Sequence, residues 1–419
     1  MVIKDNFTYI DLFAGIGGFH QAMQKYSKNS KCIMASEIDK HAAKVYFENY
    51  GIMPLGDIRN IEPNKIGKYD VVCGGFPCQT FSKAGKQKGF KDPRGTLFYE
   101  IVRLASYNKN IKDRPKILIL ENVHNLISHD GGDTWRTIKK EFKDIGYNVI
   151  ESPIVIGPKD LGIPQLRDRA IILAVRKDIY NGPINIEIPR KLRNTTSIYS
   201  IVDKKLSQKE LNEYKLSERR LKLLKCWDDF YHGIDQKILG TPIWSDEFGK
   251  KYKVDIKNEK GKYYIPKWKQ KFILWNRELY KKNKDFIDKW YRKWDIKSWT
   301  HATERKFEWQ CGEYCESVFD GIIQFRTSGI RVKRPTESPT LVTMSHIPVI
   351  GKKRRYLTVK EMARLQSFDE KFVFNEPKSF AYKQLGNAVN VDVIEFVFRK
   401  FIEFLEVETN GTEKNKRKN

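Results

Sequence analysis

The chain has 419 residues, enough for a catalytic domain of ordinary size and a second domain. Hydrophobic residues make up 40% of it, but no apolar run reaches the about 18 residues of a membrane-spanning helix, and the N-terminus lacks a signal-peptide pattern. A protein of the cytoplasm is therefore expected. Its formal net charge of +26 fits either a polyanionic partner or a merely soluble lysine-rich surface, and composition alone does not separate the two.

Residues 8–176 alternate short apolar runs with helical patterns, which is typical of a βαβ sheet. The first predicted strand, 9–13, is followed by a glycine-rich loop and by a helix that begins near Phe19. The next strand covers 31–36, and Asp39 is placed to cap a helix that ends near Gly51. This half of the chain is therefore predicted to be an α/β domain.

The glycine-rich loop and two acidic residues suggest a nucleotide-like ligand. The loop Gly15-Ile16-Gly17-Gly18 would bring backbone close to a ligand in front of a helix N-terminus. Glu37 lies about 20 residues further on at the next strand end, where a ribose diol is usually held. Asp57 ends the following segment and could accept a hydrogen bond from an adenine amino group. Each acid could instead be a helix cap.

Two further strands end in residues that suit covalent catalysis. The apolar run 69–75 leads into Phe76-Pro77-Cys78-Gln79, and Pro77 fixes one backbone angle just before the thiol. The strand 116–120 leads into Glu121-Asn122-Val123. Because active-site groups collect at the carboxyl ends of such strands, we predict that Cys78 and Glu121 emerge on the same edge of the sheet. Taken alone, a cysteine in this position would more often be an inert loop thiol.

The rest of the chain changes character twice. A helix with Trp135, Ile138 and Phe142 on one face is expected to end at Gly146, and 170–175 is another buried strand. From about 181 to 325 the βα rhythm is lost and Lys, Trp and Tyr become dense. Such a mixture suits a nucleic-acid-binding face, although half of the aromatic residues would form the core of their own domain.

The second half also holds a pair of cysteines and two further helix patterns. Cys311 and Cys315 could be half of a zinc site, but no second cysteine pair completes it, so no metal is expected. The stretch Thr358-Val359-Lys360-Glu361 is a capping-box pattern that opens a helix. A final amphipathic helix follows, and the polar tail is predicted to be disordered.

Several stretches of this sequence, in their order and spacing, resemble the motifs of the cytosine-C5 DNA methyltransferases. They are Asp11-Leu12-Phe13-Ala14-Gly15-Ile16-Gly17-Gly18-Phe19, Gly74-Gly75-Phe76-Pro77-Cys78-Gln79-Thr80-Phe81-Ser82, Gly85-Lys86-Gln87-Lys88-Gly89-Phe90, Arg94-Gly95-Thr96-Leu97-Phe98, Glu121-Asn122-Val123, Gln165-Leu166-Arg167-Asp168-Arg169, Arg334-Pro335-Thr336 and Gln384-Leu385-Gly386-Asn387-Ala388-Val389. The matches span 9–176 and 334–395.

The resemblance implies a Rossmann-like, S-adenosylmethionine-dependent methyltransferase sheet with a second, smaller target-recognition domain. The catalytic domain is expected over 1–180 and the recognition domain over 181–333. A C-terminal segment, 334–408, is expected to return to the catalytic domain before the disordered tail 409–419.

The resemblance also implies a pocket for S-adenosylmethionine, which would leave as S-adenosylhomocysteine. Phe13 should pack on the adenine, Glu37 with its neighbour Ile38 should hold the ribose, and Asp57 with Ile58 should meet the adenine edge. The residues expected to line the rest of the pocket are Gly15, Ile16, Gly17, Gly18, Gly75, Pro77, Leu97 and Asn387.

The implied reaction accounts for the predicted catalytic set. Carbon 5 of cytosine is a poor nucleophile, so the thiolate of Cys78 would first add at carbon 6. Glu121, next to Asn122, would hydrogen-bond or protonate ring nitrogen 3 as charge develops there. Of the two arginines, Arg167 is expected to contact the target base and Arg169 to be more structural. The base that removes the carbon 5 proton is left open, and a water could serve.

The expected substrate is a cytosine flipped out of double-stranded DNA, because neither carbon 5 nor carbon 6 of the ring can be reached inside a duplex. The segment after the nucleophile is expected to close over the DNA. Its expected DNA contacts are Gln79, Ser82, Lys86, Lys88 and Arg94. A cognate restriction endonuclease acting separately, a nucleoid location and a bacterial or phage origin would fit this type.

Two alternatives remain open. A transfer-RNA methyltransferase of the same catalytic type usually carries Pro-Pro-Cys-Gln and a Cys-Phe-Thr signature, whereas this chain has Phe-Pro-Cys-Gln and no Cys-Phe-Thr. A catalytically silent homologue that only binds DNA could have lost the cysteine, the glutamate or the glycine loop, and all three are present.

Overall fold

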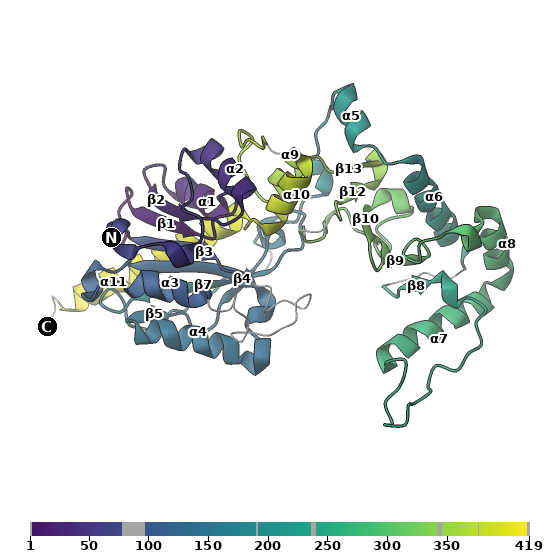
Figure 1. Cartoon of the computed structure of the whole chain (residues 1–419), viewed down its shortest axis with the longest axis horizontal. Coiled ribbons are helices and arrows are strands. Elements are labelled where there is room, and N and C mark those ends of the chain that lie inside the picture. The colour runs from purple at the N-terminus through teal and green to yellow at the C-terminus, as the bar shows by residue number, and fades with distance from the viewer. Residues whose placement is uncertain are drawn as a thin grey trace. The chain divides into compact units, whose positions relative to one another are not determined.

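The computed structural model describes residues 2–77, 97–189, 192–235, 240–341, 346–375 and 377–416, and their side chains as far as 410. The chain divides into two units (Figure 1). The first unit comprises Met1–Thr195, Thr340–Thr343 and Met362–Asn419, and the second comprises Thr196–Pro339 and Met344–Glu361. The boundary thus differs from the expected one at 181. Part of the expected returning segment 334–408 also belongs to the second unit, because β12 (Val349–Ile350) pairs with β10 (Ile322–Arg326).

A seven-stranded sheet forms the centre of the first unit. Its order is β2-β1-β3-β4-β7-β5, with β6 paired to β7. The strands are β1 (Thr8–Leu12), β2 (Lys31–Ser36), β3 (Val71–Gly75), β4 (Ile117–Val123), β5 (Tyr147–Val149), β6 (Ile154–Ile156) and β7 (Arg169–Arg176). The first four strands of this order are parallel, whereas β7 runs antiparallel to β4. Their continuous apolar sequences suit burial on both faces.

Helices lie around the sheet (Figure 1). The helices of this unit are α1 (Gly18–Tyr26), α2 (Lys40–Tyr50), α3 (Leu97–Ser106), α4 (Asp133–Asp144), α10 (Lys378–Asn387) and α11 (Val391–Lys416), and α9 (Val359–Leu365) joins the two units. Tyr26 of α1 packs edge-on against Phe398 of α11, with ring centroids 4.9 Å apart. Phe98 of α3 packs in the same way against Phe142 of α4, at 5.3 Å.

The helix boundaries test several sequence signals. Asp39 accepts hydrogen bonds from the first backbone N–H groups of α2, and Gly51 ends that helix with a φ of 71°, as predicted. Thr358 and Glu361 form the predicted capping box. The prediction of a disordered tail over 409–419 is wrong as far as Lys416, because α11 continues to that residue. Each residue added to an existing helix gains a backbone hydrogen bond, which favours this continuation.

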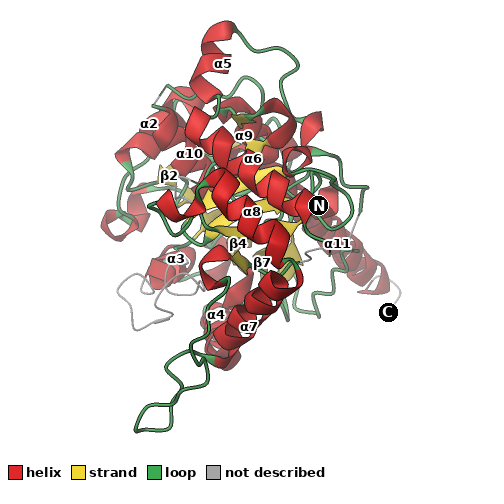
Figure 2. Cartoon of the chain, turned by 90° about the vertical axis from the view of Figure 1, so that its right-hand side faces the viewer, coloured by secondary structure: helices red, strands yellow, loops and turns green. Residues whose placement is uncertain are grey.

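The second unit is built on a six-stranded sheet in the order β13-β12-β10-β11-β9-β8. The remaining strands of this sheet are β8 (Ile243–Trp244), β9 (Lys306–Gln310), β11 (Gly329–Lys333) and β13 (Arg355–Tyr356). Four helices accompany them: α5 (Gln208–Tyr214), α6 (Glu218–Gly233), α7 (Lys267–Lys282) and α8 (Lys284–Trp294) (Figure 2). This unit therefore lacks the βα alternation of the first one, as its sequence predicts.

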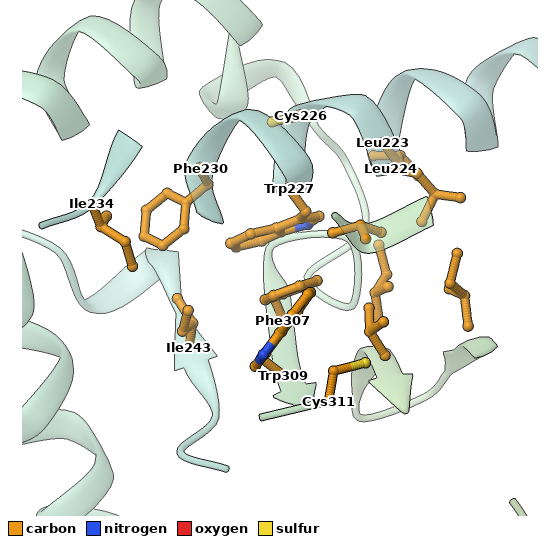
Figure 3. Packing of buried hydrophobic residues seen from close by; sticks show 14 of the residues in the cluster. Leu223, Leu224, Cys226, Trp227, Phe230, Ile234, Ile243, Phe307, Trp309 and Cys311 are labelled. Carbon is orange, nitrogen blue, oxygen red and sulfur yellow. The ribbon is translucent and has the colours of Figure 1, made fainter. Parts of the chain in front are cut away.

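An aromatic core holds the second unit together (Figure 3). Trp227 of α6 stacks on Phe307 of β9 with ring centroids 4.9 Å apart, and Trp290 of α8 donates its indole N–H to the carbonyl of Cys226 at 2.9 Å. Cys311 and Cys315 are buried in this cluster. Within the described ranges, no group of three His, Cys, Asp or Glu side chains is placed to hold a metal ion. The unit therefore has a hydrophobic core of its own.

The helices of the described part of the chain include none that is both long and apolar enough to cross a bilayer.

Candidate active site

The site lies where the chain direction reverses in the first sheet. From β1 the chain proceeds to β2 on one side, and it later returns to β3 on the other side of β1. The carboxyl ends of β1 and β3 therefore meet at a switch point, where ligands of open α/β sheets bind. The loop after β1 carries the glycines, and the chain after β3 leads through Phe76 and Pro77 to Cys78. β4, with Glu121, lies directly beside β3.

The glycine loop is held in an unusual backbone conformation. Phe13, Gly15 and Gly17 all have positive φ angles, of 55°, 56° and 88°. A non-glycine residue rarely adopts such an angle, so Phe13 stores backbone strain. The end of β2 stabilises it, because the Phe13 backbone N–H donates to the Ser36 hydroxyl at 3.3 Å. Ser36 was not among the predicted site residues, and only its position at the end of an apolar strand could have pointed to it.

Glu37 joins this loop to the next helix. One carboxylate oxygen accepts from the Gly15 backbone N–H at 2.8 Å and the other from the Asp39 backbone N–H at 2.7 Å. Burial of the carboxyl raises the pKa of Glu37 above its usual value, and these backbone donors oppose that shift. A Cβ built on Gly15 would meet no atom within 4 Å, so the loop borders open space beside this carboxylate.

The surroundings of Glu37 fit an adenosyl group. Ile38, next to Glu37 in the sequence, is 71% exposed, so apolar surface lies beside a hydrogen-bond acceptor. Phe13, Pro77 and Leu97 are half-buried. Ile16, which was expected in the pocket, is fully buried.

Asp57 has a local role in the structure. It caps the short helix η1 (Ile58–Asn60), and the Arg59 guanidinium Nε lies 3.0 Å from each of its carboxylate oxygens. These contacts lower the pKa of Asp57. Ile58 is buried, and its carbonyl accepts from Arg103 at 3.0 Å. The geometry therefore shows helix capping, and contact of Asp57 with an adenine stays a prediction.

Glu121 and Arg169 form the central ion pair of the site. The Arg169 Nε lies 2.7 Å from the Glu121 Oε1, and the two side chains are only 17% and 12% exposed. The pairing of β3 with β4 sets Glu121 beside Gly75, and a Cβ on Gly75 would come within 3.3 Å of the Glu121 Oε2. The bare backbone at Gly75 thus leaves room for this carboxylate.

Asn122 fixes the backbone that leads to the predicted nucleophile. Its side-chain N–H donates to the Phe76 carbonyl at 3.3 Å, and its side-chain oxygen accepts from the Val123 backbone N–H at 2.9 Å. Asn122 is 1% exposed, so it acts on the chain and not on a ligand in solution. Phe76, the residue that Asn122 contacts, stands two residues before Cys78 in the sequence.

The two arginines are placed opposite to expectation. Arg167, the expected base contact, is buried, and its guanidinium donates to the Leu341 carbonyl at 3.0 Å and to the Gly386 and Ala388 carbonyls at 3.1 and 2.9 Å. It therefore ties the C-terminal segment to the sheet. Arg169, the expected structural residue, is the one that pairs with Glu121.

Arg167→Met should lower the free energy of unfolding of the first unit by about 3 kcal/mol, because three buried carbonyls would lose their charged donor. Hydrogen exchange of the β7 amides across a urea series measures this loss. Arg59→Met is the matched control, because Arg59 pairs with Asp57 at the surface, and it should cost under about 1 kcal/mol. Equal losses in the two variants would contradict the structural role.

The C-terminal motif returns to the glycine loop. A Cβ on Gly18 would approach the Val389 Cγ2 to 2.7 Å, and a Cβ on Gly75 would lie 3.8 Å from the Val389 Cγ1. Asn387, expected in the pocket, is exposed at the end of α10. Val389 was not predicted as a site residue, although it stands in the same motif. Because Gly18 and Gly75 carry no Cβ, the segment with Val389 can pack closely against the backbone at both positions.

The predicted nucleophile Cys78 and the predicted DNA contacts lie outside the described residues. Those contacts are Gln79, Ser82, Lys86, Lys88 and Arg94.

Comparisons with known proteins find relatives of this chain. The family described as C-5 cytosine-specific DNA methylase matches residues 7–403. The type II methyltransferase M.AluI of Cellulosimicrobium cellulans is 30% identical over 94% of this chain and 92% of its own length. M.BanI of Aneurinibacillus aneurinilyticus is 31% identical over 93% and 94%. M.HhaI of Haemophilus parahaemolyticus is 39% identical over 46% of this chain and 56% of its own.

The solved structure of the Dnmt2 methyltransferase of S. pombe is similar in fold. It has a TM-score of 0.52 at 16% identity, with 95% of this chain and 98% of that one covered. This likeness shows the fold alone.

Proposed function

Because the chain belongs to the C-5 cytosine-specific DNA methylase family and is a DNA cytosine-5 methyltransferase, we propose that Cys78 is its nucleophile and that Glu121 and Arg169 act on the target base. The observation that carries this assignment is the shielded Glu121–Arg169 ion pair on the edge of the sheet from which Cys78 follows. The names of its relatives support a role in a type II restriction–modification system.

The proposed chemistry starts with addition of the Cys78 thiolate to carbon 6 of a flipped-out cytosine. Addition drives negative charge toward ring nitrogen 3, which Glu121 hydrogen-bonds or protonates. Arg169 holds the Glu121 carboxyl in place through a charge-assisted hydrogen bond and presents a fixed positive charge beside the base. After the methyl group is in place, loss of the carbon 5 proton lets the thiolate leave, and a water molecule can accept that proton.

The residues around the glycine loop are proposed to hold S-adenosylmethionine, which supplies the electrophilic methyl group when it is bound. Glu37 would accept hydrogen bonds from the ribose hydroxyl groups, and Phe13 and Ile38 would lie beside the adenine. Gly15 and Gly17 would let the backbone approach the amino-acid part. Gly18 and Gly75 keep Val389 against this loop, which fixes its position for binding.

Glu37→Gln should weaken binding of S-adenosylhomocysteine about tenfold or more, because a hydrogen bond to a charged acceptor is lost. Isothermal calorimetry without DNA measures this effect separately from activity. Glu48→Gln on the exposed side of α2 serves as the control and should bind as the wild type does. Unchanged affinity in Glu37→Gln would restrict Glu37 to its contacts with Gly15 and Asp39.

Cytosine-conversion sequencing of mixed genomic DNA after incubation with protein and S-adenosylmethionine tests the whole proposal. Protected cytosines within one short sequence are the expected result, and they would define the recognition sequence. Gln79, Ser82, Lys86, Lys88 and Arg94 are the proposed contacts of the catalytic unit with that DNA. Methylated transfer RNA with unmodified DNA would instead identify an RNA enzyme, and no methylation of either would identify a silent homologue.

A further inference from the structure

A strongly basic hairpin projects from the second unit before α7 (Figure 2). The segment 250–271, called the lysine hairpin below, contains nine lysines and only two acidic residues, Asp255 and Glu259. All nine lysines are exposed. They are Lys250, Lys251, Lys253, Lys257, Lys260, Lys262, Lys267, Lys269 and Lys271. The charge of this segment is therefore far more one-sided than that of a mixed, solubilising surface.

The positive charge of the lysine hairpin is not compensated. None of its nine lysines lies within 4.0 Å of a carboxylate of the described residues. Just beyond the hairpin, Lys281, Lys284 and Lys293 on α7 and α8 each pair with a carboxylate. The hairpin thus gathers nine lysines without a carboxylate partner in one short segment.

Aromatic rings hold some of these lysines in place of carboxylates. The Lys257 and Lys267 ammonium groups lie 5.0 and 5.7 Å from the centre of the Tyr263 ring, and Lys269 lies 5.9 Å from the Trp244 ring. A cation–π contact positions an ammonium group without cancelling its charge. The lysines are thus ordered and still available to an anion.

The hairpin is an ordered part of the unit. Lys257 and Tyr263 form a β-bridge across it, and the Asn258 side chain accepts from the Lys260 and Lys262 backbone N–H groups at 3.1 and 2.9 Å. At its base, Arg277 of α7 donates to the Tyr252 carbonyl at 2.7 Å. This anchoring lowers the entropy that a flexible tail would lose on binding.

The start of α7 places lysines where they oppose helix stability. Its first turn has no acidic residue and carries Lys267 and Lys269, whereas the first turns of α6 and α8 in the same unit contain Glu218 and Asp285. Positive side chains at a helix N-terminus interact unfavourably with the helix dipole and so destabilise the helix. The same end attracts anions such as phosphate. The backbone N–H groups at the start of α7 therefore add to the anion-binding capacity of the hairpin lysines.

We propose that the lysine hairpin binds the phosphate backbone of duplex DNA, independently of sequence, next to the recognised site. This inference rests on the proposed function only in taking DNA as the partner. The charge complementarity of nine unpaired lysines with regularly spaced phosphates favours duplex DNA over other partners. The hairpin raises the affinity for long DNA and does not take part in the methylation step.

Two variants with the same change of net charge test the proposal. Lys257→Gln/Lys260→Gln/Lys262→Gln neutralises the hairpin, and Lys281→Gln/Lys284→Gln/Lys293→Gln neutralises three lysines that already have carboxylate partners. Binding to a labelled random-sequence 40-base-pair duplex (a probe length of about four helical turns) is measured by anisotropy between about 50 and 300 mM NaCl. Circular dichroism melting checks that both variants remain folded.

The hairpin variant should bind about tenfold more weakly, and the slope of log affinity against log salt should fall by about 2 to 3. The control should change this slope by less than about 1. At saturating DNA the hairpin variant should methylate at the wild-type rate.

Equal behaviour of the two variants would overturn the proposal, and so would a lower methylation rate of the hairpin variant at saturation. Preferential binding of transfer RNA through the hairpin would also overturn it. If the wild type binds duplex DNA but methylates none, the proposed reaction fails while the binding result for the hairpin remains readable.

Discussion

Cys78→Ser should reduce cytosine methylation by about four orders of magnitude or more, the scale seen when a catalytic nucleophile is removed. A serine hydroxyl is un-ionised at neutral pH and is a much poorer nucleophile than a thiolate, so it adds to carbon 6 far more slowly. Binding of S-adenosylhomocysteine should stay nearly unchanged, because the proposed pocket does not use the thiol. Single-turnover methylation and calorimetry measure the two quantities separately.

DNA that carries 5-fluorocytosine at the target position gives a direct view of the covalent bond. Fluorine cannot leave carbon 5 as a cation, so the adduct with Cys78 should persist on a denaturing gel. Cys73→Ala is the matched control, because Cys73 is a buried thiol on β3 whose pKa is raised well above its usual value by burial. This control should still form the adduct. Substantial turnover in Cys78→Ser would rule out the covalent mechanism.

The sequence predicts those parts of the fold that depend on local patterns. Asp39 and Gly51 bound α2 as predicted, because caps act on the backbone groups of their own helix. β3, which ends at Gly75, and β4, which carries Glu121, also lie side by side, as the placement of these residues after two apolar runs implies. The edge of the sheet on which the site lies could therefore be found without coordinates.

The roles of the two arginines could not be found in the same way. Arg167 and Arg169 are two residues apart before one strand, and nothing local distinguishes them. Their difference comes from partners that are distant in sequence, since Arg167 is held by carbonyls of the C-terminal segment and Arg169 by Glu121. The pairing of β12 with β10, which assigns 344–361 to the second unit, is likewise a non-local contact.

Asp57 shows a second limit of prediction from sequence, in which the partner is local but the role is still undecided. Its partner, Arg59, is only two residues away. The sequence therefore allowed the capping role, but it could not rank that role against contact with a ligand. Side-chain geometry was needed, because both carboxylate oxygens accept from the same guanidinium.

Glu121→Gln should lower the methylation rate about 100-fold, within the range expected for loss of an acid–base group. The glutamine can still accept a hydrogen bond from Arg169 and can donate one to ring nitrogen 3, but it cannot transfer a proton to that nitrogen. Affinity for DNA should therefore remain close to that of the wild type. Glu100→Gln is the matched control, because Glu100 also pairs with an arginine, Arg103, at 2.7 Å, but on α3.

Release of tritium from carbon 5 of cytosine, without methyl donor, shows which step Glu121 serves. Exchange requires addition of the thiolate at carbon 6 and a carbanion-like carbon 5, and both depend on the charge accepted at nitrogen 3. If Glu121 assists addition, exchange and methylation should fall together in Glu121→Gln. Normal exchange with slow methylation would place the role of Glu121 after addition. A wild-type rate for both would leave the Glu121–Arg169 pair with no part in the chemistry.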